Sequence, residues 1–218
     1  HNEDIKCIKE YLIALSEAKV DAIIVSDSLI IDIINDNNIN LKVHISTQAS
    51  TLNYEAVSFW KSQGVERVVL AREMSKNEIK EIIDKTGMEI ETFVHGAMCS
   101  SYSGRCVLSN YFTKRDANRG GCAQICRWEF PLYDKNNNMI ESETKFTASS
   151  KDLMMLTKVK EMIEIGIVSL KVEGRMRSNY YVATVINTYR NLIDDYYENK
   201  LTEEKVEYYQ KILDRVAN

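Results

Sequence analysis

The amino-acid sequence predicts an α/β protein: a partial (β/α) TIM-barrel-like parallel sheet with a Cys-rich insert and C-terminal helices. Three observations support this fold class. Four short apolar runs begin at residues 21, 42, 67 and 89, so the steps between them are 21, 25 and 22 residues. Stretches with helical periodicity separate these runs, as expected for repeated βα units. A segment rich in cysteine and glycine then interrupts the pattern, before two final helical stretches.

The first part of the chain alternates strands and helices. We expect strands over residues 21–27, 42–48, 67–71 and 89–94, and helices over residues 29–34, 54–63 and 76–85. Ser75, with Glu78 three residues later, has the pattern of a capping box at the start of the third helix. Gly64 and Gly87 stand where helix C-caps belong. These units make up the expected barrel-like domain, residues 1–95.

The rest of the chain is expected to contain three further segments. Residues 96–150 form the Cys-rich insert and a hairpin, in which a strand over 128–133 turns at 134–138 and pairs with 144–149. Residues 151–178 hold the last barrel helix, which starts at Asp152 and runs to about residue 164, and a strand over 169–173. Residues 179–218 form helices over 179–198 and 202–216. A complete barrel needs eight strands, so the sheet is either open or lacks upstream strands.

Composition and charge narrow the class of protein. The chain is 44% hydrophobic and 28% charged, as in ordinary globular proteins. Its apolar runs, such as residues 22–25, are too short to cross a bilayer, and its polar, acidic start does not resemble a secretory signal. We therefore expect a cytoplasmic protein with reduced thiols and no membrane partner. The first residue is not methionine, and we expect the chain to be a piece of a longer one.

Four of the five cysteines lie close together in the sequence, and we interpret them as metal ligands. They are Cys99, Cys106, Cys122 and Cys126. In a reducing compartment such a cluster favours a metal over disulfides. Four thiolates can complete a tetrahedral zinc site or hold a four-iron four-sulfur cluster. Only Cys122 and Cys126 have the short spacing usual for structural zinc, so the spacing leaves both metals open.

The cysteine-bearing segment is strongly basic in an acidic protein. Between residues 99 and 127 the local charge is +4, whereas the whole chain carries −4. The basic residues are Arg105, Lys114, Arg115, Arg119 and Arg127, and the only acid is Asp116. These charges could offset a negatively charged cluster. They could also bind an anionic substrate, either a small carboxylate or an RNA backbone.

Polar residues follow several predicted strands, at the ends where ligands bind in parallel βα folds. The candidate catalytic residues are His95, Arg72, Glu73, Lys171, Glu173 and Arg175. The candidate substrate-binding residues are Gln48, Arg105, Arg119, Arg127 and Arg177. A single residue of this kind is more often a solvated loop charge. Their expected convergence on one barrel face strengthens the functional interpretation of the set.

Hydrolase motifs are weak in this chain. The sequence contains neither G-x-S-x-G nor H-E-x-x-H. His95 and Cys99 are four residues apart, and a Cys–His protease is conceivable. That cysteine fits better as one of four metal ligands.

Several long motifs resemble the collagenase-like peptidase family (unassigned peptidase family 32). The similarity covers most of the chain and weakens after about residue 197. The segments that carry it are residues 44–48, 69–73, 91–109 and 170–178 and the stretch Arg119-Gly-Gly-Cys-Ala-Gln-Ile-Cys-Arg127. This last stretch looks most like the branch that makes 5-hydroxyuridine at the tRNA wobble position. Family chains normally begin with further βα units, which supports the interpretation as a fragment with an open sheet edge.

The resemblance implies an activity that spacing alone does not. It implies an oxygen-independent hydroxylase that binds a four-iron four-sulfur cluster through Cys99, Cys106, Cys122 and Cys126. It also implies tRNA as substrate and prephenate, or another small carboxylate, as oxygen donor. The basic strand-end residues would suit these anions. An open sheet edge would invite association with a second copy of the chain or with another subunit.

Two other functions remain open at this point. The family name implies a peptidase, which would cleave collagen-like substrates. The chain could instead be a non-catalytic RNA-binding module with structural zinc. Such a module would hold one zinc ion and need no oxygen donor. A role in the ubiquinone pathway is a further branch of the same family.

Overall fold

A computed structural model describes residues 2–103, 105–140, 146–149 and 151–216. The chain divides into two compact units. The first combines His1–Val94 with Thr157–Lys171, and the second combines His95–Leu156 with Val172–Asn218.

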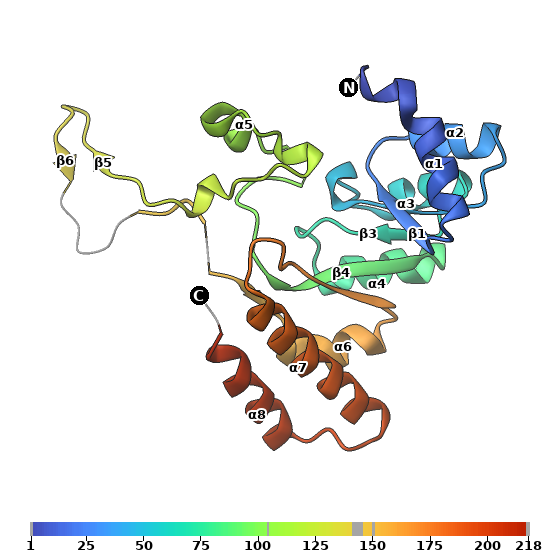
Figure 1. The fold of residues 1–218 in the computed structure, drawn as a ribbon. Coiled ribbons are helices and arrows are strands. Elements are labelled where there is room, and N and C mark those ends of the chain that lie inside the picture. Colours follow the sequence, from blue (N-terminus) through green and yellow to red (C-terminus); the bar gives the residue numbers. More distant parts are fainter. Residues whose placement is uncertain (1, 104, 141–145, 150, 217–218) are drawn as a thin grey trace. The chain divides into compact units, whose positions relative to one another are not determined.

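The first unit contains the predicted βα repeats (Figure 1). The chain enters through a 3-10 turn, η1 (Asp4–Cys7), and helix α1 (Ile8–Glu17). The repeats are β1 (Ala22–Val25), α2 (Leu29–Asp36), β2 (Lys42–Ile45), α3 (Tyr54–Ser62), β3 (Arg67–Val69), α4 (Lys76–Thr86) and β4 (Glu89–Gly96). A short 3-10 turn, η2 (Thr47–Ala49), follows β2. The four predicted strands are confirmed, each at or within one residue of its expected start.

The strands β1, β2, β3 and β4 pair in this order, and every pair is parallel. The fifth parallel strand, β8 (Ser169–Val172), pairs with β4. The backbone N–H groups of Val168 and Glu173 donate to the carbonyls of Ile90 and His95. Strand β8 therefore runs parallel to β4. The five parallel strands form a half-barrel, which confirms the predicted fold class.

Local signals explain why these elements form where they do. Ser75 and Glu78 make the predicted capping box at the start of α4, which Gly87 ends in the left-handed conformation. The apolar side chains that alternate along the strands are buried, among them Ile45, Val68, Ile90 and Val94. Burial of this strand face supplies the core of the first unit.

The expected helix start at Asp152 is wrong. Residues Leu153–Met154 form a short strand, β7, which pairs antiparallel with the end of β4. A 3-10 turn, η5 (Leu156–Lys158), follows, and helix α6 (Val159–Glu164) begins only there. Asp152 looked like a helix cap by type. Pairing with His95 and Gly96, which no local pattern signals, decided the structure of this segment.

The second unit carries the Cys-rich insert and the C-terminal helices. The insert contains α5 (Leu108–Thr113), η3 (Ala117–Arg119), η4 (Ile125–Arg127) and a hairpin of β5 (Leu132–Tyr133) and β6 (Met139–Ile140). The hairpin turn at residues 134–138 is confirmed, with β6 as the partner. Phe146 bridges Phe130, although residues 144 and 145 of the expected strand lie outside the described part.

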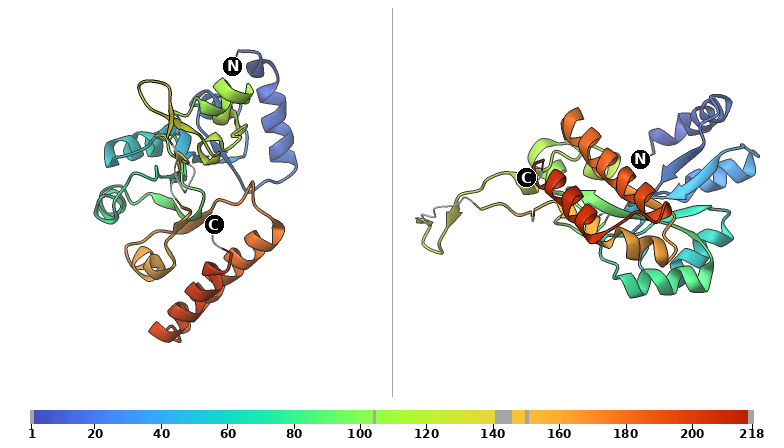
Figure 2. Two further views of the ribbon diagram at one scale, coloured as in Figure 1. Left: turned by 90° about the vertical axis from the view of Figure 1, so that its left-hand side faces the viewer. Right: turned by 90° about the horizontal axis from the view of Figure 1, so that it is seen from below.

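Helices α7 (Asn179–Tyr197) and α8 (Glu203–Asp214) close the chain and confirm the predicted C-terminal helices. They pack side by side, as both views in Figure 2 show. Their buried side chains include Val185, Leu192 and Leu213.

Among the described helices, none is both long and apolar enough to cross a membrane.

Candidate functional site

Chain neighbours of the four cysteines are joined by hydrogen bonds within the second unit. The guanidinium of Arg127, next to Cys126, donates to the carbonyl of Met98, next to Cys99 (3.4 Å). The amide side chain of Asn118 donates to the carbonyl of Cys106 (3.4 Å). These contacts join the stretch around Cys126 to the stretch around Cys99, and Asn118 to Cys106.

A buried serine and an arginine hold the stretch around Cys122. The hydroxyl of Ser109, 1% exposed, accepts from the backbone N–H of Ala123 (2.9 Å). Arg175, in the loop after β8, donates to the carbonyl of Gly120 (2.8 Å). The backbone N–H of Gln124 points at the Cys122 sulfur (3.4 Å). Such N–H donors also stabilise a metal-bound thiolate.

The donor chemistry of the segment fits a thiolate-bound metal or cluster. The five cysteines, all of them described, are thiols rather than disulfides. Across the described residues, however, no three His, Cys, Asp or Glu side chains are grouped closely enough to hold a metal ion. The chain therefore supplies four thiols and hydrogen bonds that hold their loops, but the described side chains do not form a coordination shell.

Asp152, which is not among the residues predicted for the site, contacts three side chains of this unit. Its carboxylate, 6% exposed, accepts from Arg177 (2.5 Å) and from the Tyr181 hydroxyl (3.0 Å), and lies 3.3 Å from Arg127. Burial, followed by the hydrogen bond to Asp152, raises the pKa of Tyr181 to about 12. Two predicted substrate-binding residues, Arg127 and Arg177, are thus engaged by an internal carboxylate.

His95 lies in the interior rather than at an open surface. It is 3% exposed, and its Nδ1 lies 3.3 Å from the Tyr189 hydroxyl. Its ring also packs near Tyr181, with centroids 5.9 Å apart. Burial lowers the pKa of His95, and although Asp152 opposes that shift, the ring is neutral at neutral pH. The backbone carbonyl of His95 accepts from the N–H of Glu173 (2.9 Å).

The remaining predicted residues of the second unit lie in loops or on the surface. Glu173 accepts from the backbone N–H of Arg175 through its carboxylate (3.0 Å). Arg105 and Arg119 are exposed. The second unit therefore contains His95, Glu173, Arg175, Arg177 and all the insert residues.

Four predicted residues belong to the first unit instead. They are Gln48, Arg72, Glu73 and Lys171. Gln48 sits in η2 after β2, and its backbone N–H donates to Ser46. The guanidinium of Arg72 lies 3.7 Å from the centroid of the Phe93 ring, and Lys171 lies 5.8 Å from the same ring. Two predicted cations of the first unit therefore share one aromatic residue.

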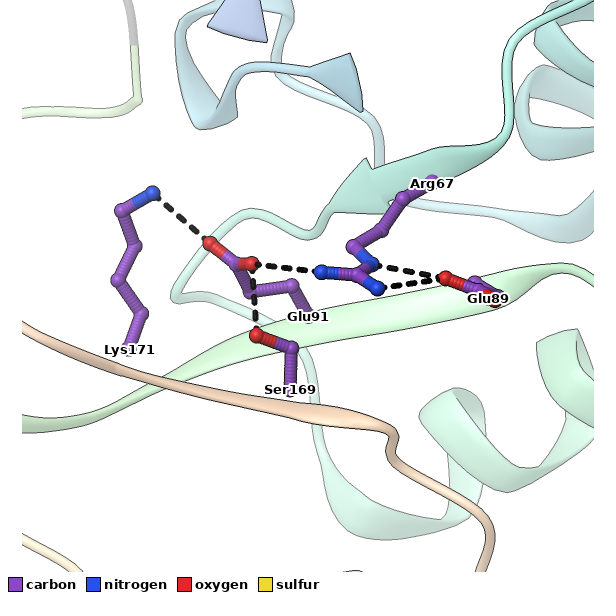
Figure 3. Close-up of polar contacts among 5 residues, drawn as sticks. All are labelled: Arg67, Glu89, Glu91, Ser169 and Lys171. Atoms are coloured by element: carbon purple, nitrogen blue, oxygen red, sulfur yellow. Dashed lines mark hydrogen bonds and ion pairs between the residues drawn. The ribbon is translucent and has the colours of Figure 1, made fainter. Parts of the chain in front are cut away.

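The first unit has a polar cluster of its own, centred on Glu91 (Figure 3). Glu91 is not among the residues predicted for the site. Lys171 and Ser169 on β8 donate to its two carboxylate oxygens, each at 2.8 Å. Arg67 on β3 lies 3.8 Å from Glu91 and donates twice to Glu89. Burial alone would raise the pKa of Glu91, but the hydrogen bonds from Lys171 and Ser169 outweigh it and lower the pKa. The cluster links three strands through one buried carboxylate.

No local signal would have identified either missed carboxylate. Asp152 stands 25 positions from both Arg127 and Arg177, and Glu91 stands 80 positions from Lys171. One indirect hint existed for Asp152. Residues 99–127 carry five basic residues and one acid, which leaves a local excess of positive charge for a carboxylate from outside this stretch to neutralise.

Comparison with known proteins identifies the family. The whole chain, residues 1–218, matches Peptidase family U32. It is 52% identical over 201 residues to tRNA hydroxylation protein P1 of Bacillus subtilis, covering 90% of this chain and 48% of that protein. It is 34% identical to tRNA hydroxylation protein P of Haemophilus influenzae, covering 94% and 55%. A Collagenase of Porphyromonas gingivalis is also 34% identical, covering 100% and 55%.

These similarities have a defined extent. The chain spans about half the length of the curated relatives it matches. The match to the family nevertheless runs over every residue of this sequence. The chain belongs to Peptidase family U32.

Proposed function

We propose that this chain is part of a tRNA-modifying hydroxylase that adds a hydroxyl group to C5 of a uridine. The observation that carries this proposal is the 52% identity to a tRNA hydroxylation protein over 90% of the chain. In the net reaction a C–H bond of the uracil ring is replaced by C–OH, which is a two-electron oxidation. The oxygen donor, prephenate or another small carboxylate as the family resemblance implies, would give up its hydroxyl group, accept the two electrons and carry the displaced hydrogen in its place.

We further propose that Cys99, Cys106, Cys122 and Cys126 hold a four-iron four-sulfur cluster. Four thiols with loops tied together by Arg127, Asn118 and Ser109 support this assignment. When bound, the cluster would supply a redox or electrophilic centre. The N–H of Gln124, which already points at the Cys122 sulfur, would stabilise negative charge on that ligand.

The surrounding charges have separate roles in this proposal. Arg127 and Arg177 neutralise Asp152 and so position the insert, rather than meeting substrate. The exposed guanidinium groups of Arg105 and Arg119 remain the candidates for carboxylate or phosphate. In the first unit, Arg72 beside Phe93 is the candidate for the small carboxylate, whereas Lys171, near the same ring, is paired with Glu91.

A peptidase is the alternative that the family name and the Collagenase relative suggest. A Cys–His peptidase would need His95 to orient toward a nucleophile. The His95 Nδ1 instead lies beside the Tyr189 hydroxyl, and the ring is buried. No feature of the described residues favours zinc-dependent RNA binding over the hydroxylase.

The function is tested by the nucleosides of cellular tRNA. Cells that lack the gene are expected to lose 5-hydroxyuridine and nucleosides derived from it, as measured by mass spectrometry of digested tRNA. The wild-type gene and the Cys7→Ala variant should restore them, because Cys7 is an exposed thiol outside the insert. Cys99→Ala and Cys122→Ala should not. Unchanged tRNA nucleosides in the deletion strain would refute the proposed function.

A further inference from the structure

Several large aromatic side chains of the insert are exposed to solvent. Tyr111 and Phe112 on α5 are 81% and 51% exposed, and Tyr102 is 65% exposed. The rings of Tyr111 and Phe112 meet edge to face, with centroids 5.1 Å apart. Phe112 also packs 6.2 Å from Phe130 of the hairpin strand region. Tyr111, Phe112 and Phe130 therefore form a connected group of rings, of which Tyr111 and Phe112 are exposed to solvent.

Unpaired cations surround this aromatic group in the sequence. Lys114 directly follows α5 in the left-handed conformation, and Arg115 comes next. Both are exposed, as is Arg105. In the part of the chain that the structure describes, no carboxylate pairs with the side chains of Arg105, Lys114 or Arg115. Their charges are thus available to a ligand.

Aromatic faces combined with cations match one chemistry better than others. Proteins that bind single-stranded nucleic acid stack unpaired bases on aromatic side chains and hold the phosphates with lysine and arginine. A paired helix offers no free base face for such stacking. Large exposed aromatic groups are also uncommon on surfaces without a binding role.

We propose that this surface binds unpaired nucleotides of an RNA loop. We call it the stacking surface, and it consists of Tyr111, Phe112, Lys114, Arg115 and Phe130. Tyr111 and Phe112 stack on bases, and the two cations contact phosphates. The inference rests on the proposed function, because it names the part of a tRNA, an unpaired loop, that the insert would hold.

A second copy of the chain fits the stacking surface less well. A symmetric dimer would place the same patch against itself. The cations of the two copies would then face one another, and each copy has a local charge of +4 over residues 99–127. An RNA loop instead brings negative charge to these cations.

The test measures binding of a fluorescent RNA stem-loop to the full protein by anisotropy. Tyr111→Ala and Phe112→Ala should each weaken binding roughly tenfold, the typical loss for one stacked base. Tyr197→Ala is the matched control. Tyr197 is likewise exposed, at 65%, and meets Tyr196 edge to face at 5.3 Å, but it lies on α7. Its loss should leave RNA affinity unchanged.

Salt dependence tests the cations separately. Replacing Lys114 or Arg115 by glutamine should lower the slope of log affinity against log salt by about 0.7 for each phosphate contact removed. A duplex RNA of the same length should bind at least tenfold more weakly than the stem-loop, because its bases are already stacked and paired.

Four results would overturn the inference. The first three are absence of RNA binding by the wild-type protein, equal affinity of Tyr111→Ala and Tyr197→Ala, and equal affinity for loop and duplex. The fourth is a change in oligomeric state with unchanged RNA affinity, which would favour self-association. Loss of stem-loop affinity in the Tyr111→Ala variant would support the stacking surface whatever the tRNA nucleosides show. Unchanged nucleosides in cells without the gene would refute only the proposed function.

Discussion

Replacing Asp152 by alanine is expected to lower the free energy of unfolding by about 3–5 kcal/mol. The carboxylate is almost fully buried and accepts from Arg177 and Tyr181, with Arg127 at 3.3 Å. Its removal leaves two guanidinium groups in the interior without a counter-charge. Because Arg127 also holds the carbonyl of Met98, the stretches around Cys99 and Cys126 should loosen as well.

Urea unfolding followed by circular dichroism measures this loss, and the chain offers a matched control. Asp194 on α7 also pairs with an arginine, Arg190, but both side chains are about half exposed. Asp194→Ala should therefore cost no more than about 0.5 kcal/mol. Equal losses in the two variants would mean that the Asp152 network contributes no more than a surface ion pair.

Replacing Gly96 by alanine is expected to cost about 2–6 kcal/mol of stability, from strained backbone and overpacking together. Gly96 has a φ of +103°, which side chains rarely adopt. An added Cβ would overlap the carbonyl oxygen of Glu173 and lie 3.0 Å from its carbonyl carbon. These atoms belong to backbone, which cannot move aside cheaply. Gly96 also pairs with Leu153 of β7, so this strand should be displaced.

Gly64→Ala separates the two causes. Gly64 also has a positive φ, +82°, but no atom lies within 4 Å of the Cβ position. Its substitution should cost only the backbone term, about 1 kcal/mol. Thermal unfolding of both variants measures the difference. If Gly96→Ala were no more destabilising than Gly64→Ala, the close approach of β4 to Glu173 would have no energetic importance.

The strands and helices of the first unit were predictable because their signals are local. The apolar runs at residues 22–25 and 42–45 mark β1 and β2, and Ser75 with Glu78 marks the start of α4. Strand β7 was missed for the opposite reason. Its two residues carry no strand pattern and become a strand only by pairing with the end of β4.

The cysteines of the candidate site were visible in the sequence, but the contacts around them were not. The four cysteines were visible from spacing, and the excess of basic residues in the insert was visible from composition. That Arg127 and Arg177 face Asp152 depends on pairing between residues far apart in the sequence. The burial of His95 between tyrosines of α7 depends on the same kind of long-range packing.

The proposed iron–sulfur cluster in the insert is tested most directly by the metal content of the anaerobically purified full protein. We expect about four irons and four acid-labile sulfides per chain. Cys99→Ala and Cys122→Ala should lose both, whereas Cys7→Ala should keep both. One equivalent of zinc without sulfide, or iron and sulfide retained in the Cys99 and Cys122 variants, would contradict the account.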